Sequence, residues 1–178
     1  MPHSNYPPKT WNKKISVLIA ITTLILAVCA TLAAFKASAY GNKMVLAQSQ
    51  ASDQWAYYQA KSIKETAYQL QFNALELAAR ENPSNPLLPQ SMSDYQEEIR
   101  RYQEEKQAIA DQAKQLEAAR DQAQKLNADF SQALMFLQVG ILLSSLASIN
   151  KVLYYWCAGL ASGIAGIWIL IAAWLQSF

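Results

Sequence analysis

Three long stretches of the sequence carry no charged residue at all. They are residues 15–35, 130–149 and 152–178. A helix that spans a membrane needs about 20 apolar residues, because a rise of about 1.5 Å per residue must cross a hydrocarbon core about 30 Å thick. A soluble chain of 178 residues could not cover three uncharged helices of this length. The sequence therefore predicts an all-α membrane protein with three transmembrane helices.

The acidic residues are confined to the segment between the first and second stretches. Every Asp and Glu lies between Asp53 and Asp129. Charged side chains are costly in hydrocarbon, so we expect this segment to form a long antiparallel, coiled-coil-like helical hairpin outside the membrane. The predicted segments are a disordered tail at 1–14, transmembrane helices at 15–35, 130–149 and 152–175, and the hairpin at 36–129.

A proline-rich loop divides the hairpin into two arms. Pro83, Pro86 and Pro89 lack the backbone donor of a helix and clash with its preceding turn. They predict a loop over about residues 81–92. The arms then cover about residues 43–80 and 93–129, and their matched lengths suit an out-and-back hairpin.

Other local signals predict where the arms begin. The pair Gly41-Asn42 predicts a bend between the first span and the first arm. Ser93 and Gln96 have the spacing of a capping box, which predicts the start of the second arm. Residues 93–138 contain no Gly or Pro, so the second arm and the second span should form one unbroken helix.

Apolar residues recur along each arm at helical spacings, mostly alternating three and four. This pattern is typical of the core of a coiled coil. The predicted first seam is Ala56, Ala60, Ile63, Ala67, Leu70, Ala74 and Leu77, and the second is Tyr95, Ile99, Tyr102, Ile109, Ala113, Leu116, Ala123, Leu126 and Phe130. An alanine-rich seam buries little area, and burial contributes only about 25 cal/mol per Å². We therefore expect the hairpin to pack against other copies of the chain.

The lysines at the ends of the spans predict the orientation. Lys9, Lys13 and Lys14 precede the first span, and Lys151 is the only charge between the second and third. Three crossings bring these lysines to one side, which the positive-inside rule makes cytoplasmic. The hairpin would then be periplasmic in a bacterial inner membrane.

A cleaved signal peptide is the alternative for the N-terminal segment. Ala37-Ser38-Ala39 fits a cleavage site after a basic start and an apolar run. We favour an uncleaved anchor, because the apolar run is longer than the apolar region of about 7–15 residues in a signal peptide. Both alternatives export the hairpin.

The spans contain small and polar residues that suit helix packing. Gly159, Gly163 and Gly166 allow close helix contact, either within the chain or in a dimer. Gln138 belongs to a set of polar residues in the second span whose other members are Gln132, Ser144, Ser145 and Ser148. These residues either hydrogen-bond neighbouring helices or line a pathway in an oligomer.

The sequence lacks the residue patterns of catalysis and cofactor binding. The only histidine is His3, in the proline-rich tail, and the polar segment has no Cys or His. We therefore expect no catalytic residues, no metal site and no cofactor. The net charge of +2 and the absence of a basic run with aromatics exclude a nucleic-acid partner.

One segment of the first arm combines aromatic and basic residues. Trp55, Tyr57, Tyr58, Gln59, Lys61 and Lys64 lie within ten residues. They predict either a docking surface near the lipid headgroups or aromatics packed on the returning helix, with lysines reaching toward lipid phosphates. We name these six residues the collar.

The collar also carries a resemblance to a known family. Residues 49–64 read SQASDQWAYYQAKSIK, and this segment is similar to the signature of a bacterial membrane family of unknown function, DUF4337. The resemblance extends over roughly Trp11 to Leu175, although the prolines of residues 82–90 depart from it. It implies a bacterial membrane location and the layout of one span, a helical region and two spans. It implies no activity, substrate or cofactor.

Two functions remain open for such a chain. The first is a non-enzymatic, oligomeric scaffold or adaptor whose partners are the lipid bilayer, other copies and another envelope protein. The second is an oligomeric channel or transport component whose pore is lined by the second span. We favour the scaffold, because the spans contain no charged ring or filter-like loop.

Overall fold

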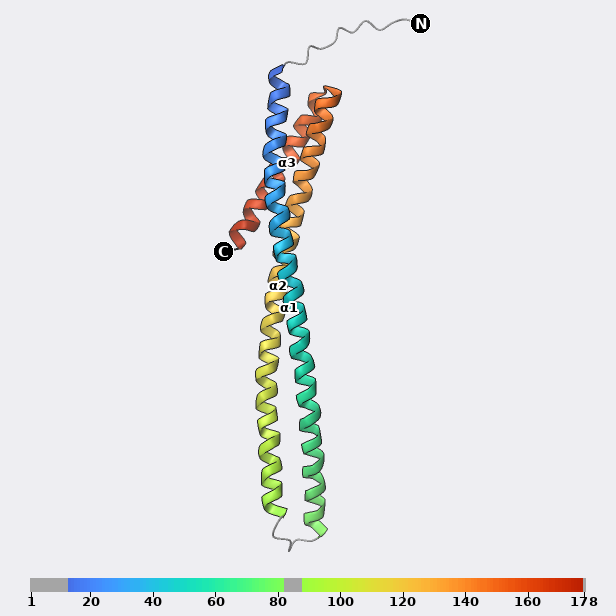
Figure 1. Cartoon of the computed structure of the whole chain (residues 1–178), viewed down its shortest axis with the longest axis vertical. Helices are drawn as coiled ribbons and strands as arrows, with labels where there is room; N and C mark the ends of the chain where they lie inside the picture. Colours follow the sequence, from blue (N-terminus) through green and yellow to red (C-terminus); the bar gives the residue numbers. More distant parts are fainter. Residues whose placement is uncertain (1–12, 82–87, 178) are drawn as a thin grey trace, which may run out of the picture. The chain divides into compact units, whose positions relative to one another are not determined.

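The chain folds into three helices joined by short connections. The computed structural model describes residues 13–81 and 88–177, so the predicted tail with His3 lies almost wholly outside the described residues, as do Pro83 and Pro86. The helices are α1 (Lys13–Glu81), α2 (Leu88–Asn150) and α3 (Leu153–Gln176). Figure 1 shows α1 and α2 running antiparallel along each other. The all-α prediction is thus confirmed.

Helix α1 does not end where the sequence predicted a bend. It continues through Gly41 and Asn42 as one helix of 69 residues. A Cβ atom on Gly41 would lie 3.1 Å from the Asn127 side chain of α2. The Asn127 amide also donates a 2.6 Å hydrogen bond to the Ala37 carbonyl. Glycine therefore makes room for a neighbouring helix at this position and does not interrupt its own helix.

Helix α2 begins earlier than its predicted capping box. Its first residue is Leu88, so Ser93 and Gln96 lie inside the helix and the capping-box prediction is wrong. The predicted loop is likewise too long, because Pro89 lies in the first turn of α2. Proline is tolerated there, since the N–H groups of the first turn have no partner within the helix. From Leu88 the helix continues to Asn150, which confirms the unbroken helix.

The chain divides into two compact units. One consists of Met1–Asn42 and Ala123–Phe178, and we call it the three-helix unit. The other consists of Lys43–Gln122, and we call it the hairpin unit. All three helices contain a stretch that is long and apolar enough to cross a membrane, by length and composition.

A small-residue contact holds α3 against α2 in the three-helix unit. A Cβ atom on Gly166 would lie 3.0 Å from the backbone nitrogen of Leu137 and 3.1 Å from the carbonyl oxygen of Ala133. A Cβ atom on Gly159 would likewise lie only 2.9 Å from the carbonyl oxygen of Gly140. Glycine permits this approach, because a larger residue would strike the backbone of the opposite helix.

Helix α1 closes the same unit through larger side chains. Leu26 is buried and its methyl groups lie against Gly163, where a Cβ atom would be 2.6 Å away. Phe130 is fully buried, and its ring stacks on Tyr40 with centroids 5.7 Å apart. The core therefore combines residues from all three helices.

Two contacts show which helix ends lie together within this unit. Ser16 and Ser148 line one groove, so the start of α1 and the end of α2 lie together. The Lys36 ammonium lies 4.4 Å from the ring centroid of Trp174, near the end of α3. Lys151 takes a left-handed conformation with φ of 54° and makes the turn from α2 to α3. Lys13 and Lys151 thus belong to one end of the unit, as three antiparallel passes require.

We expect Gly166→Ala to destabilise the three-helix unit by about 1–3 kcal/mol, because the added carbon meets backbone atoms that cannot move separately. Gly163→Ala is the matched control. Its added carbon meets the tip of the flexible Leu26 side chain, so its cost should be smaller. The free energy of unfolding can be measured by SDS titration in mild detergent. If Gly163→Ala lowered the free energy of unfolding as much as Gly166→Ala or more, the backbone contact at Gly166 would not be the tighter of the two.

Candidate functional site

The predicted seam of α2 lies at the interface between the two helices of the hairpin unit. Ile99, Tyr102, Ile109 and Ala113 are buried, and Tyr95 and Leu116 are half-buried. These residues follow the spacing read from the sequence. The prediction for this arm is therefore confirmed.

The predicted seam of α1 is wrong. Its residues Ala56, Ala60, Ile63, Ala67, Leu70, Ala74 and Leu77 are all exposed. The exposed fractions of Ile63, Leu70 and Leu77 are 72%, 65% and 62%. We call these seven residues the outer stripe, because they lie on the side of α1 that faces away from α2.

A different face of α1 packs against α2. Ala47 and Ala51 are buried, and the face continues through half-buried Trp55, Tyr58, Lys61, Ser62, Glu65, Tyr68 and Phe72. Aromatic side chains bury about 150–250 Å² each, far more than alanine. The aromatic face therefore gains more from contact with α2 than the apolar but alanine-rich stripe does. The helical spacing of these aromatic residues was the signal in the sequence that could have identified this face.

Two ion pairs join the helices within this face. Lys61 Nζ donates to Glu105 Oε2 at 2.5 Å, and Lys106 Nζ lies 2.5 Å from Glu65 Oε2. The second pair is the more enclosed, since the side chains of Lys106 and Glu65 are only 18% and 12% exposed. Their arrangement is reciprocal, because each helix supplies one lysine and one glutamate. This reciprocity specifies which residues of α1 and α2 lie opposite each other.

The ion pairs shift the pKa values of Glu65, Glu105 and Lys61. The hydrogen bond from Lys106 lowers the pKa of Glu65, and the bond from Lys61 lowers the pKa of Glu105. The bond to Glu105 raises the pKa of Lys61. The carboxylates of Glu65 and Glu105 and the ammonium of Lys61 are thus held in their charged forms near neutral pH.

Aromatic rings surround the ion pairs. The Lys61 ammonium lies 5.2 Å from the ring centroid of Tyr102, and the Lys106 ammonium lies 5.2 Å from that of Tyr58. Tyr68 packs between Tyr95 and Tyr102, with centroid separations of 5.7 and 5.5 Å. These contacts are attractive cation–π and aromatic interactions.

The structure divides the collar between the two faces of α1. Trp55, Tyr58 and Lys61 contact α2, and Trp55 Nε1 donates a 2.9 Å hydrogen bond to Glu117. The other collar residues are exposed and border the outer stripe: Tyr57, Gln59 and Lys64. Half of the collar thus belongs to the interface, and the other half belongs to an open surface.

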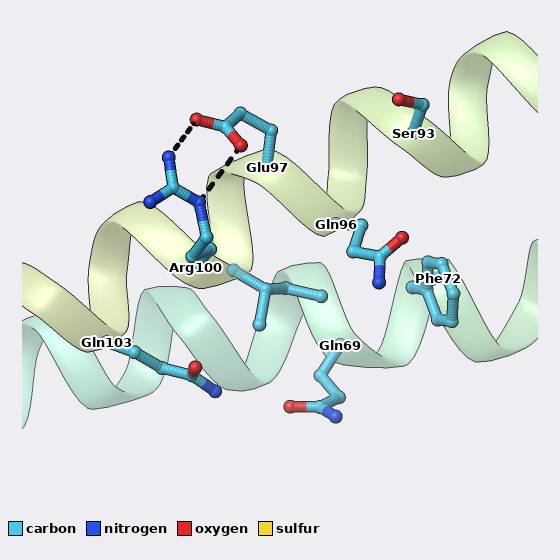
Figure 2. Close-up of a pocket in the computed structure, with 8 residues that line it drawn as sticks. Gln69, Phe72, Ser93, Gln96, Glu97, Arg100 and Gln103 are labelled. Atoms are coloured by element: carbon cyan, nitrogen blue, oxygen red, sulfur yellow. Dashed lines mark hydrogen bonds and ion pairs between the residues drawn. The ribbon is translucent and has the colours of Figure 1, made fainter.

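A groove lies between α1 and α2 close to the connection between them. Figure 2 shows Gln69 and Phe72 of α1 opposite Gln96 and Gln103 of α2. Its volume is about 520 Å³. Glu97 and Arg100 at its rim pair with each other at 2.6 Å. Amides and a self-satisfied ion pair make a polar surface without a nucleophile or a base positioned by a partner.

The remaining predicted residues lie in the three-helix unit. Gly159, Gly163 and Gly166 are buried at the contacts of α3 with the other helices of the same chain. Gln138 is exposed on α2. Ser144 is fully buried, and its hydroxyl lies 2.9 Å from the position of a Cβ atom on Gly159. Ser144, Ser145 and Ser148 line one groove together with residues of α1, and Gln138 is not part of that lining.

Within residues 13–81 and 88–177, no group of three or more His, Cys, Asp and Glu side chains is arranged to hold a metal ion. Cys29 is half-buried and Cys157 is exposed, and both are free thiols.

Comparison with known proteins identifies the chain at the level of a family. The model of a family described as a domain of unknown function (DUF4337) matches residues 14–176. No curated protein matched the chain, and no solved structure matched it.

We expect Glu65→Gln to weaken the hairpin locally by about 1–3 kcal/mol at pH 7, because a charge-assisted hydrogen bond is lost. The folded pKa of Glu65 is lowered, so its contribution is present above the ordinary glutamate pKa of about 4.3 and is lost as the pH falls through the folded pKa. Hydrogen exchange of the hairpin amides at pH 7 and near pH 3, corrected for intrinsic rates, measures both effects.

The control for this variant is Glu104→Gln, whose carboxylate is 64% exposed. It should change exchange little, because exposed ion pairs contribute about 0–1 kcal/mol. Equal effects of the two substitutions would mean that the pair between Glu65 and Lys106 does not hold the helices together.

Proposed function

The chain belongs to the DUF4337 family, and we propose that it is a membrane-anchored helical hairpin that acts as an oligomeric scaffold or adaptor. Its three apolar helices anchor it in a bacterial inner membrane. The hairpin unit extends into the periplasm and presents helical surfaces to other proteins. The chain has no catalytic role.

The observation that carries this proposal is the separation of charge between the two units. The three-helix unit contains a single acidic residue, Asp129, whereas the other twelve of the thirteen acidic residues belong to the hairpin unit. Uncharged helices are stable in hydrocarbon, whereas charged side chains are costly there. The two units are therefore suited to different solvents.

Lysines at the ends of the three-helix unit support the proposed orientation. Lys13 and Lys14 begin α1 and Lys151 makes the turn from α2 to α3, so all three flank the apolar stretches, where the positive-inside rule applies. Lys36 lies beside Trp174, a lysine–tryptophan pair that suits the opposite headgroup region. The proposal therefore assigns the start of α1 to the cytoplasm.

The scaffold role is supported by the chemistry of the hairpin unit. Its inner face is occupied by ion pairs that neutralise each other and by aromatic rings. Its groove is lined mainly by amide side chains and by Glu97 and Arg100, which pair with each other. An extended helical surface of this kind is suited to binding other helices.

A channel is the second candidate, and one observation favours it. Gln138 is exposed in an apolar part of α2, where its amide needs a hydrogen-bonding partner or water. If several copies surrounded a pore, Gln138 could contact the water in it. Ser144, Ser145 and Ser148 line a groove beside α1 of the same chain, and polar residues at a contact between helices favour the scaffold.

We expect a cysteine placed at exposed Glu81, in a background of Cys29→Ala and Cys157→Ala, to react with an impermeant maleimide in intact spheroplasts. The protein should also resist extraction by alkaline carbonate. The matched control is Asn150→Cys, at the exposed end of α2 next to Lys151. This cysteine should react only after lysis. The reverse labelling pattern would mean that the proposed orientation is inverted. Release of the protein by carbonate would mean that its helices do not span the membrane.

The substitution Gln138→Leu separates the scaffold from the channel. If the amide binds a neighbouring helix, oligomers should weaken and ion flux through reconstituted protein should stay at the background level. A pore would give the opposite result, with altered flux and unchanged assembly. Cross-linked copy number and liposome flux are measured on the same preparation, with exposed Met135→Leu as the control.

A further inference from the structure

We propose that the outer stripe of α1 is the surface on which two copies of this chain pair, with their α1 helices parallel and in register. This inference rests on the proposed membrane anchoring, because anchoring makes both hairpins leave the bilayer in the same direction. It names the partner as a second copy and the contact as the face from Ala56 to Leu77.

The outer stripe is a regular apolar seam without a partner among residues 13–81 and 88–177 of its own chain. Its spacing alternates three and four without a break over seven residues. Ile63, Leu70 and Leu77 are each more than 60% exposed. Contiguous exposed apolar surface of this kind marks an interaction site, whereas singly scattered apolar residues do not. The alternation of three and four is the repeat that another helix, running alongside, would match.

The order of residues in the stripe suits a parallel, symmetric pair. Alanine occupies one core position at Ala60, Ala67 and Ala74. The other core position is occupied by Ile63, Leu70 and Leu77, with Ala56 at its start. In a parallel pair each core layer contacts the same layer of the second copy. The alanine layers let the backbones approach, and the isoleucine and leucine layers fill the space between them.

The residues that flank the stripe would also match in this register. In a parallel coiled coil, the residue before an alanine layer faces the residue five positions later in the second copy. This rule pairs Gln59 with Lys64 of the second copy. Further along, it pairs Thr66 with Gln71 and Asn73 with Ala78. No like charges meet, because Lys64 is the only charged residue among these six exposed residues.

Other occupants fit the stripe less well. The α2 helix of the same chain is already paired with the aromatic face through reciprocal ion pairs. The outer face of α2 carries charged residues such as Glu97, Arg100 and Glu104, so it would bring charges against apolar side chains. A second copy of the stripe offers an uncharged surface of matching period, and confinement to one membrane raises its effective concentration.

Cysteine cross-linking of the full chain in native membranes tests this pairing. In the background of Cys29→Ala and Cys157→Ala, Leu70→Cys should form a disulfide-linked dimer under mild oxidation, because layers of identical residues approach closely enough for that bond. The matched control is Glu104→Cys on α2, where the native side chain is equally exposed at 64%. We expect at least a tenfold faster dimerisation at position 70.

The outcomes distinguish this inference from the proposed function. A Leu70→Cys chain that stays monomeric but resists carbonate extraction overturns the pairing and leaves the anchor intact. A covalent adduct with a different protein overturns it as well. Release of the chain by carbonate would contradict the proposed function, because the chain would not be anchored. If the released chain still formed the dimer at position 70, the claim that pairing depends on anchoring would be wrong.

A second pair of variants covers the case in which oxidation traps random collisions. Ile63→Glu with Leu70→Glu introduces charges at positions that are exposed in the single chain, so the helical content should remain. The dimer fraction in mild detergent should fall at least fivefold. Gln69→Glu, one residue from the stripe, should leave that fraction unchanged. Equal dimer fractions for the two variants would overturn the proposal.

Discussion

The backbone contact between α2 and α3 is the interaction on which the three-helix unit depends. Gly159 and Gly166 allow the helices to approach until a Cβ atom would touch the opposite backbone. Leu26 of α1 is buried beside Gly163 and Gly140, so α1 packs against both helices. In hydrocarbon, where water supplies no driving force, such close packing provides much of the attraction between helices. The residues that allow α2 and α3 to approach are therefore small.

The hairpin unit depends on a different kind of contact. Its two helices meet through aromatic rings and reciprocal ion pairs, above all Lys61 with Glu105 and Lys106 with Glu65. These pairs relate specific positions of the two long helices to each other. Their position on the inner face leaves the apolar stripe of α1 open. The use of polar residues for internal packing is thus what makes an apolar surface available for a partner.

Some features were predictable because they depend on residues close together in sequence. The α2 seam was predicted correctly, since its large apolar residues, such as Ile99, Tyr102 and Ile109, are also the ones that are buried. The α1 seam was predicted incorrectly, because apolar character was taken as the guide while aromatic and charged residues at the same spacing formed the interface. The capping box failed for a related reason. Ser93 and Gln96 have the right spacing, but the helix had already begun at Leu88.

By itself, the sequence determined the helical character, the uncharged stretches of three helices and the antiparallel course of the first two. These properties follow from periodicity, proline position and the distribution of charge along one chain. The tertiary structure decided which face of α1 turns toward α2 and which glycines lie against the opposite backbone. Both depend on the summed contacts of residues such as Tyr68 and Tyr102, which are far apart in sequence. Two faces of α1 carried a suitable repeat, and only the partner helix selected between them.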